Sequence, residues 1–130
     1  MLFASIVLFF CDYAMAEIYN ADIQATGIIS IMNVNTVTGI FDVVISDVSS
    51  TEEIEKIEVP VWSQPDQSDI VWYITEKQAD GTYVAHVDVA YHDCNFTKYQ
   101  VHTYVKTKSG HMLNIGMDEV DLTSPETVVK

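Results

Sequence analysis

Tryptophan and tyrosine side chains recur at short intervals between residues 60 and 104. Each ring offers a large apolar face and one polar atom, so it can stack on a sugar ring and hydrogen-bond to it. Trp62 borders a polar loop over residues 64–69, and strand alternation sends Tyr73 outward if Trp72 points inward. We therefore predict a ligand-binding set of exposed aromatic residues: Trp62, Tyr73, Tyr91 and Tyr104. The alternative for Trp62 is packing beneath that loop, at the end of the core.

Four histidines and two cysteines are the other residues with potential for chemistry. A zinc site needs three or four ligands, and no short-spaced His-x-His or Cys-x-x-Cys pair begins one. Cys94 with His92 or His102 could form a nucleophile and base pair, but the segment lacks the helix that usually presents such a cysteine. Three loop carboxylates could offer oxygens to calcium, although their spacing fits no EF-hand: Asp66, Asp69 and Asp80. We predict no catalytic residue, no metal site and no cofactor.

The candidate residues fall on short segments that are rich in β-branched residues and alternate with polar ones. Turn signals separate these segments at roughly ten-residue spacing. Seven strands are predicted, over residues 23–34, 40–48, 57–62, 70–76, 82–89, 99–107 and 111–116. The pattern favours an all-β fold, an immunoglobulin-like antiparallel β-sandwich of about seven strands.

Several residues are assigned structural roles in this sandwich. Trp72 is predicted to be buried on a central strand, and Tyr99 opens a late strand at the position of a tyrosine corner. Pro60 cannot donate to a β-ladder, so it predicts a sheet edge or a bulge. Asp80 and Gly81 predict a tight hairpin turn.

The chain has 130 residues, an ordinary size for one domain. An apolar run over residues 2–10 and a small-x-small site at Ala14-Met15-Ala16 resemble a signal peptide, although no Lys or Arg precedes the run. An uncleaved anchor and lipidation at Cys11 are the alternatives. After cleavage Cys94 is the only cysteine, so no internal disulfide can form. Three segments are expected: a signal peptide over residues 1–16, one domain over 17–122 and a frayed tail over 123–130.

The sequence is strongly acidic, with a formal net charge of −13 at pH 7 and no arginine. A surface of this sign repels phosphate backbones and anionic lipids. We therefore expect no nucleic-acid partner and, once the leader is removed, no membrane partner. Contact with a bacterial wall would have to come from stacking and hydrogen bonds, or through bridging cations.

Together these residues resemble the streptococcal Bsp-like repeat, which is known from a secreted group B streptococcal protein and from cell-wall hydrolases. The resemblance covers about residues 34–116. It depends on a series of short motifs at residues 60–63, 67–73, 80–83, 92 and 99–104. The segment between His92 and Tyr99 departs from the pattern because it lacks a glycine before the tyrosine.

The resemblance implies an exported, non-catalytic β-sandwich module of the kind that accompanies amidase, peptidase or glucosaminidase domains and helps to target them to the wall. It also implies that His92 and His102 tie a loop to a strand. We expect a secreted or wall-associated module of the Gram-positive envelope that binds peptidoglycan, through its glycan or stem peptide, beside a partner hydrolase or surface protein. The alternatives are a protein–protein or self-association module and a wall hydrolase dependent on Cys94.

Overall fold

The computed structural model of the protein describes residues 23–123. The predicted signal peptide over residues 1–16 lies outside the described residues, as does the predicted tail except for Thr123. Nowhere between residues 23 and 123 is there a helix with the length and apolar character needed to cross a bilayer.

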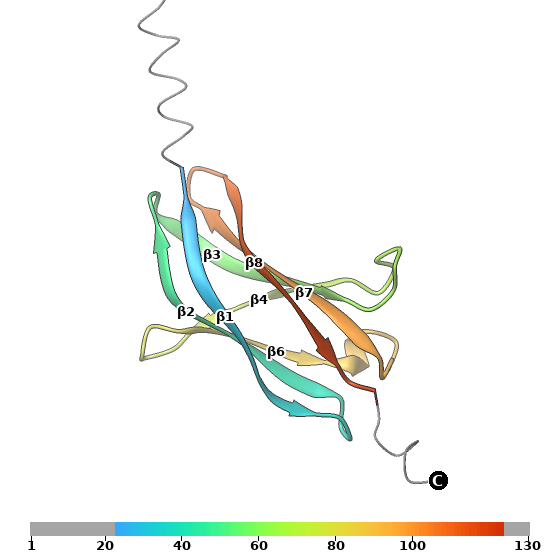
Figure 1. Ribbon diagram of the computed structural model, residues 1–130. Coiled ribbons are helices and arrows are strands. Elements are labelled where there is room, and N and C mark those ends of the chain that lie inside the picture. Colours follow the sequence, from blue (N-terminus) through green and yellow to red (C-terminus); the bar gives the residue numbers. More distant parts are fainter. Residues whose placement is uncertain (1–22, 124–130) are drawn as a thin grey trace, which may run out of the picture.

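Eight strands form two antiparallel four-stranded sheets that pack face to face (Figure 1). The first sheet has the order β1-β2-β6-β5 and the second the order β4-β3-β7-β8. The strands are β1 (Ala25–Asn35), β2 (Ile40–Ser50), β3 (Ile54–Trp62), β4 (Val71–Ile74), β5 (Glu76–Lys77), β6 (Tyr83–Asp88), β7 (Lys98–Thr107) and β8 (Met112–Asp121). One short 3-10 helix, η1 (Val89–Tyr91), follows β6. This strand order is that of immunoglobulin-like domains, and the predicted all-β sandwich is confirmed.

The core lies between the inner faces of the two sheets. Alternate residues of β2 are buried, namely Phe41, Val43 and Ile45, and they face alternate residues of the second sheet. Val59 and Val61 of β3 are likewise fully buried. Because β-branched and aromatic residues occupy every second position, each strand can bury one face and leave the other to solvent.

The segment predicted as one strand over residues 70–76 is divided between the two sheets. β4 pairs with β3, whereas β5 pairs with β6 in the other sheet. Thr75 lies at the crossing point, where its amide and hydroxyl both donate to the carbonyl of Ile57, at 3.0 and 2.9 Å. This division accounts for eight strands in place of about seven.

The position of β4 at the sheet edge overturns the prediction for Trp72. Trp72 is 47 % exposed and points away from the core, so the prediction of a buried tryptophan on a central strand is wrong. Its neighbour Tyr73 packs against the core instead. The reason is the register of β4 on β3, because Tyr73 lies opposite the buried Val59, and adjacent residues of a strand face opposite ways.

Pro60 also differs from expectation, because it lies neither at a sheet edge nor at a bulge. β3 is an inner strand between β4 and β7. The pairing of β3 with β7 runs to Glu58↔Tyr104 and resumes at Val61↔Val101 without a shift of register. The missing N–H of Pro60 therefore falls within an interruption of this ladder, where no donor is needed.

Two local predictions correspond to geometry in the structure. Tyr99 is fully buried at the start of β7, and its hydroxyl donates to the carbonyl of Asn95 at 2.7 Å, as in a tyrosine corner. In the turn before β6, Gly81 has a φ of 91°, and the Asp80 carboxylate accepts from the amide and hydroxyl of Thr82 at 3.0 and 2.8 Å. Both contacts are made within a few residues along the chain, which is why sequence could indicate them.

Candidate functional site

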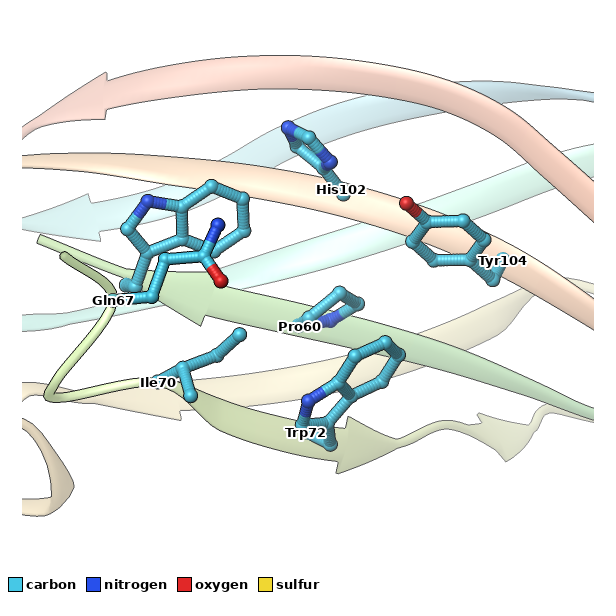
Figure 2. Close-up of a pocket in the computed structure, with 7 residues that line it drawn as sticks. Pro60, Gln67, Ile70, Trp72, His102 and Tyr104 are labelled. Atoms are coloured by element: carbon cyan, nitrogen blue, oxygen red, sulfur yellow. The ribbon is translucent and has the colours of Figure 1, made fainter. Parts of the chain in front are cut away.

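The solvent face of the second sheet carries a shallow groove of about 150 Å³, which we call the aromatic groove. Three strands and the loop between β3 and β4 contribute to it (Figure 2). Its lining residues are Pro60 and Trp62 of β3, Gln67 and Ile70 of the loop, Trp72 of β4, and His102 and Tyr104 of β7.

Strand alternation explains why these residues share one face. Val59, Val61, Val101 and Val105 point into the core. The even-numbered residues between them on β3 and β7 must therefore point to solvent. Antiparallel register then sets Trp72 directly across from Pro60, so the tryptophan at the sheet edge joins the same surface.

The rings of the groove contact one another in sequence across the sheet. Trp62 meets His102 edge to face, with centroids 4.7 Å apart and planes at 65°. The ring centroids of His102 and Tyr104 are 6.4 Å apart. Those of Tyr104 and Trp72 are 5.8 Å apart, with their ring planes at 35°. Pro60 is buried although it lies on the outer face, and in Figure 2 it lies between Trp72 on one side and His102 and Tyr104 on the other. Aromatic pairs in this range stabilise each other, so the groove is preformed.

The groove is polar in places but carries no permanent charge on its lining side chains. Burial lowers the pKa of His102 below its ordinary value of 6.5, so its imidazole is neutral at pH 7. Within residues 23–123, the side-chain polar atoms of Gln67, Trp72, His102 and Tyr104 make no hydrogen bond. Donors and acceptors therefore surround an apolar floor and are free for a ligand.

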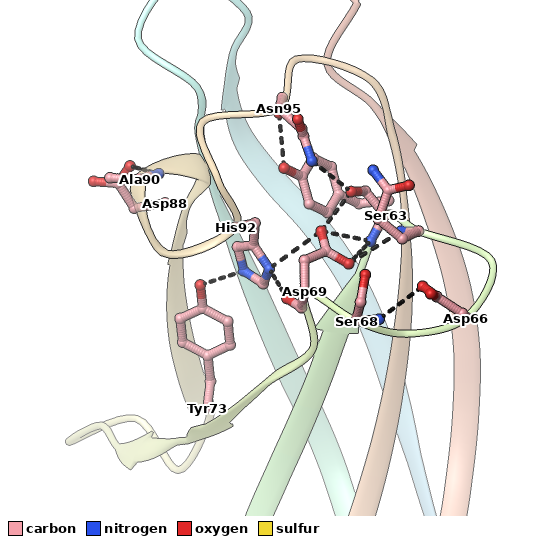
Figure 3. A network of polar contacts seen from close by, with 11 residues as sticks. Ser63, Asp66, Ser68, Asp69, Tyr73, Asp88, Ala90, His92 and Asn95 are labelled. Carbon is pink, nitrogen blue, oxygen red and sulfur yellow. Dashed lines mark hydrogen bonds and ion pairs between the residues drawn. The ribbon is translucent and has the colours of Figure 1, made fainter.

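A buried hydrogen-bond network holds the loop that forms one wall of the groove (Figure 3). The Asp69 carboxylate accepts from the amides of Ser63 and Gln64, both at 3.0 Å, and from the Ser63 hydroxyl. His92 is fully buried, and its Nδ1 lies 2.8 Å from the Asp69 carbonyl oxygen. Because a carbonyl only accepts, Nδ1 carries the hydrogen, and Nε2 accepts from the Tyr73 hydroxyl at 2.7 Å.

The ionisation of this network follows from its burial and its donors. Burial raises the pKa of the Asp69 carboxyl, but the hydrogen bonds from Ser63 and Gln64 outweigh burial and hold that pKa below its ordinary value. Burial raises the pKa of Tyr73 to about 12. The network therefore holds a buried carboxylate and a neutral phenol at neutral pH. It supports the loop from the inner side, while Gln67 and Ile70 line the groove on the outer side.

The structure brings together two of the four predicted ligand-binding residues. Trp62 and Tyr104 line the aromatic groove, whereas Tyr73 is half-buried and hydrogen-bonded to His92, so the prediction that Tyr73 points outward is wrong. Tyr91 is 70 % exposed on η1 but does not line the groove.

Other groove residues were missed or given other roles. Trp72 was expected in the core, and Gln67 and Ile70 were not singled out. His92 ties the loop to β4 as the resemblance implies, but His102 does not, because its ring lies among the aromatic residues instead. The alternation of valines on β3 and β7 could have predicted that the His102 side chain lies on the outer face of the sheet.

The alternative chemistry at Cys94 and at the loop carboxylates finds no support in the geometry. Both ring nitrogens of His92 are hydrogen-bonded, one to Asp69 and the other to Tyr73. This histidine therefore has no unengaged ring nitrogen that could act as a base for the exposed Cys94. The Asp66 carboxylate accepts a hydrogen bond from the Ser68 amide, and the Asp69 carboxylate accepts one from the Ser63 amide. Across the described part of the chain, no group of three or more His, Cys, Asp or Glu side chains is arranged to hold a metal ion.

Fold and site together define an immunoglobulin-like β-sandwich with a preformed aromatic groove on one sheet. The family model of the GBS Bsp-like repeat matches residues 30–120, and the chain belongs to that family. No curated protein matches the sequence.

Solved structures share the fold, among them two Bacillus proteins. One is a polysaccharide deacetylase from Bacillus cereus, with a TM-score of 0.62. The other is a Bacillus anthracis protein with a provisional assignment to the same enzyme class, with a TM-score of 0.60. Each is 10 % identical to this chain, covers 75 % of it, and is covered by it over only 30 % of its own length. At this identity the likeness shows the fold alone.

Proposed function

We propose that the chain is a non-catalytic module of the Gram-positive cell envelope, secreted or wall-associated, which binds peptidoglycan through the aromatic groove. The observation that carries the proposal is the gathering of Trp62, Trp72 and Tyr104 in one uncharged groove on a well-paired sheet. Rigid aromatic rings on a sheet offer stacking area at low entropic cost. Membership in the Bsp-like repeat family supports a surface module, for which a partner hydrolase or surface protein would supply any catalytic activity.

Retention on purified peptidoglycan tests this function. We expect the wild-type protein to be retained and Trp72→Ala to bind about tenfold more weakly, which corresponds to ~1.4 kcal/mol. Tyr91→Ala is the matched control, because it removes an aromatic ring that is 70 % exposed but lies outside the groove. Absence of wild-type retention, or equal retention of the two variants, would contradict the proposal.

A second candidate function is self-association through the other sheet. On the outer face of β1 and β2, the apolar side chains of Ile28, Met32 and Ile40 are 54 %, 48 % and 42 % exposed. Exposed apolar patches often mark contacts between proteins. Light scattering after size exclusion decides between the candidates, because self-association requires a mass above that of the monomer, and Met32→Ser should restore the monomer.

A further inference from the structure

We propose that the aromatic groove recognises the uncharged glycan strand of peptidoglycan and not its stem peptides. This inference builds on the proposed function and narrows its ligand to one chemical class. Three features of the groove support it: its position on the sheet face, its lack of charge, and its unengaged polar atoms.

The position of the groove disfavours a peptide ligand. An extended peptide is usually bound by adding a strand to an open sheet edge, where its main chain finds free partners. The floor of the groove is β3, which pairs with β4 on one side and β7 on the other. A peptide laid over this face meets side chains in place of free main-chain groups. A pyranose can stack on the face of a single aromatic ring, and Trp72 and Tyr104, with centroids 5.8 Å apart, offer such faces beside Pro60.

Charge disfavours the peptide as well. Stem peptides carry ionised carboxylates beside their amino groups, and glycerol-phosphate polymers of the wall carry phosphates. No Lys lines the groove within the described residues, and the sequence has no arginine. Glu58 lies across from Tyr104, and its carboxylate is 3.7 Å from the Lys56 ammonium. With a net charge of −13, the protein repels anions, whereas a neutral sugar is unaffected.

The unengaged polar atoms suit hydroxyl and acetamido groups. The Gln67 carboxamide both donates and accepts, the neutral His102 imidazole does the same, and Tyr104 contributes a hydroxyl. In Figure 2 these three side chains stand around Pro60 and Trp72. The groove thus combines a stacking surface with several neutral hydrogen-bonding groups, which is the combination that a sugar ring requires.

Tryptophan fluorescence provides a direct test, because the sequence has two tryptophans and both line the groove. The full chain is titrated separately with an oligomer of N-acetylglucosamine, a synthetic stem peptide and a glycerol-phosphate polymer. We expect a saturable fluorescence change with the sugar and none with the stem peptide or the phosphate polymer. Trp72→Phe retains a ring and Trp62 as reporter, and should weaken sugar binding less than Trp72→Ala; Tyr91→Ala should bind as wild type.

The outcomes separate this inference from the function on which it builds. Binding of the stem peptide without binding of the sugar would overturn the inference and leave wall binding intact. Retention on peptidoglycan with no response to the sugar oligomer would also overturn it. Loss of wild-type retention on peptidoglycan would overturn the proposed function itself.

Discussion

Trp72 contributes the most exposed ring of the aromatic groove, and the adjacent Tyr73 belongs to the interior. The two side chains differ in role because they lie on opposite faces of β4. Trp72 is available to a ligand, whereas the Tyr73 hydroxyl is committed to His92. At the scale of single residues, the exposure of an aromatic ring therefore follows from the face of the sheet on which it lies and not from residue type alone.

Tyr99 provides a test of the tyrosine corner. Its ring is fully buried and its hydroxyl donates to the Asn95 carbonyl at 2.7 Å, while burial raises its pKa to about 12. Tyr99→Phe leaves this carbonyl without its donor, so we expect a loss of about 1 kcal/mol in the free energy of unfolding. Urea denaturation measures it. Tyr91→Phe, at an exposed position, is the control and should change nothing; equal stability of the two variants would contradict the role of the corner.

The loop between β3 and β4 is the element that couples the interior to the groove. On its inner side the loop is bound by His92 and Asn95 and by its own Asp69 carboxylate. Its outer side presents Gln67 and Ile70. Ser63 takes part three times, because its backbone amide and its hydroxyl both donate to the Asp69 carboxylate and its hydroxyl also accepts from the side-chain amide of Asn95 at 3.3 Å. A loop held at this many points presents its groove residues in one arrangement, which reduces the entropic cost of binding.

Asp69→Asn should weaken this loop in a pH-dependent way. The folded-state pKa of Asp69 lies below its ordinary value of 3.8, so its carboxylate adds stability above that pH. This stability is lost as the pH falls through the lowered folded-state pKa. We therefore expect Asp69→Asn to reduce the free energy of unfolding by about 1–3 kcal/mol at neutral pH. The difference from wild type should narrow under strongly acidic conditions.

Urea denaturation at a series of pH values measures this narrowing. Asp47→Asn serves as the control, because Asp47 is exposed on β2, and its stability should stay within about 0.5 kcal/mol of wild type. A difference between Asp69→Asn and wild type that is the same at every pH would show that the charge of Asp69 does not contribute.

At the scale of the whole molecule, an acidic surface surrounds an uncharged groove. The sequence carries a net charge of −13, yet no lining residue of the groove is permanently charged. Binding that depends on stacking and neutral hydrogen bonds is not screened by salt, whereas binding to a charged polymer is. The fold itself depends on its apolar core, because Cys94 is the one cysteine among the described residues and is a free thiol.

Salt dependence of peptidoglycan retention follows from this arrangement. Between about 0.1 M and about 1 M salt the Debye length falls from about 10 Å to about 3 Å, and we expect retention to change by less than about twofold. Sedimentation with peptidoglycan at both concentrations measures this. A steep loss of retention in salt, or a loss on adding a chelator, would show instead that charge or bridging cations hold the protein to the wall.

Strand periodicity and turn residues were enough to predict the sandwich, because both are local properties of a chain. The sequence also indicated Tyr99 and the Asp80-Gly81 turn, whose hydrogen bonds close within a few residues. Trp62 and Tyr104 were predicted for a ligand site because their aromatic chemistry is visible in sequence.

Which aromatic residues meet at the surface depends on the pairing of strands that are distant in the sequence. Alternation places Trp72 and Tyr73 on opposite faces, but the register of β4 on β3 selects the outward one. Likewise His102 joins Trp62 only because β7 pairs with β3, some forty residues away in the chain. Local periodicity does not indicate which face of a strand the other sheet will cover. The set of residues that lines the groove is therefore decided by how the strands pair and how the two sheets pack.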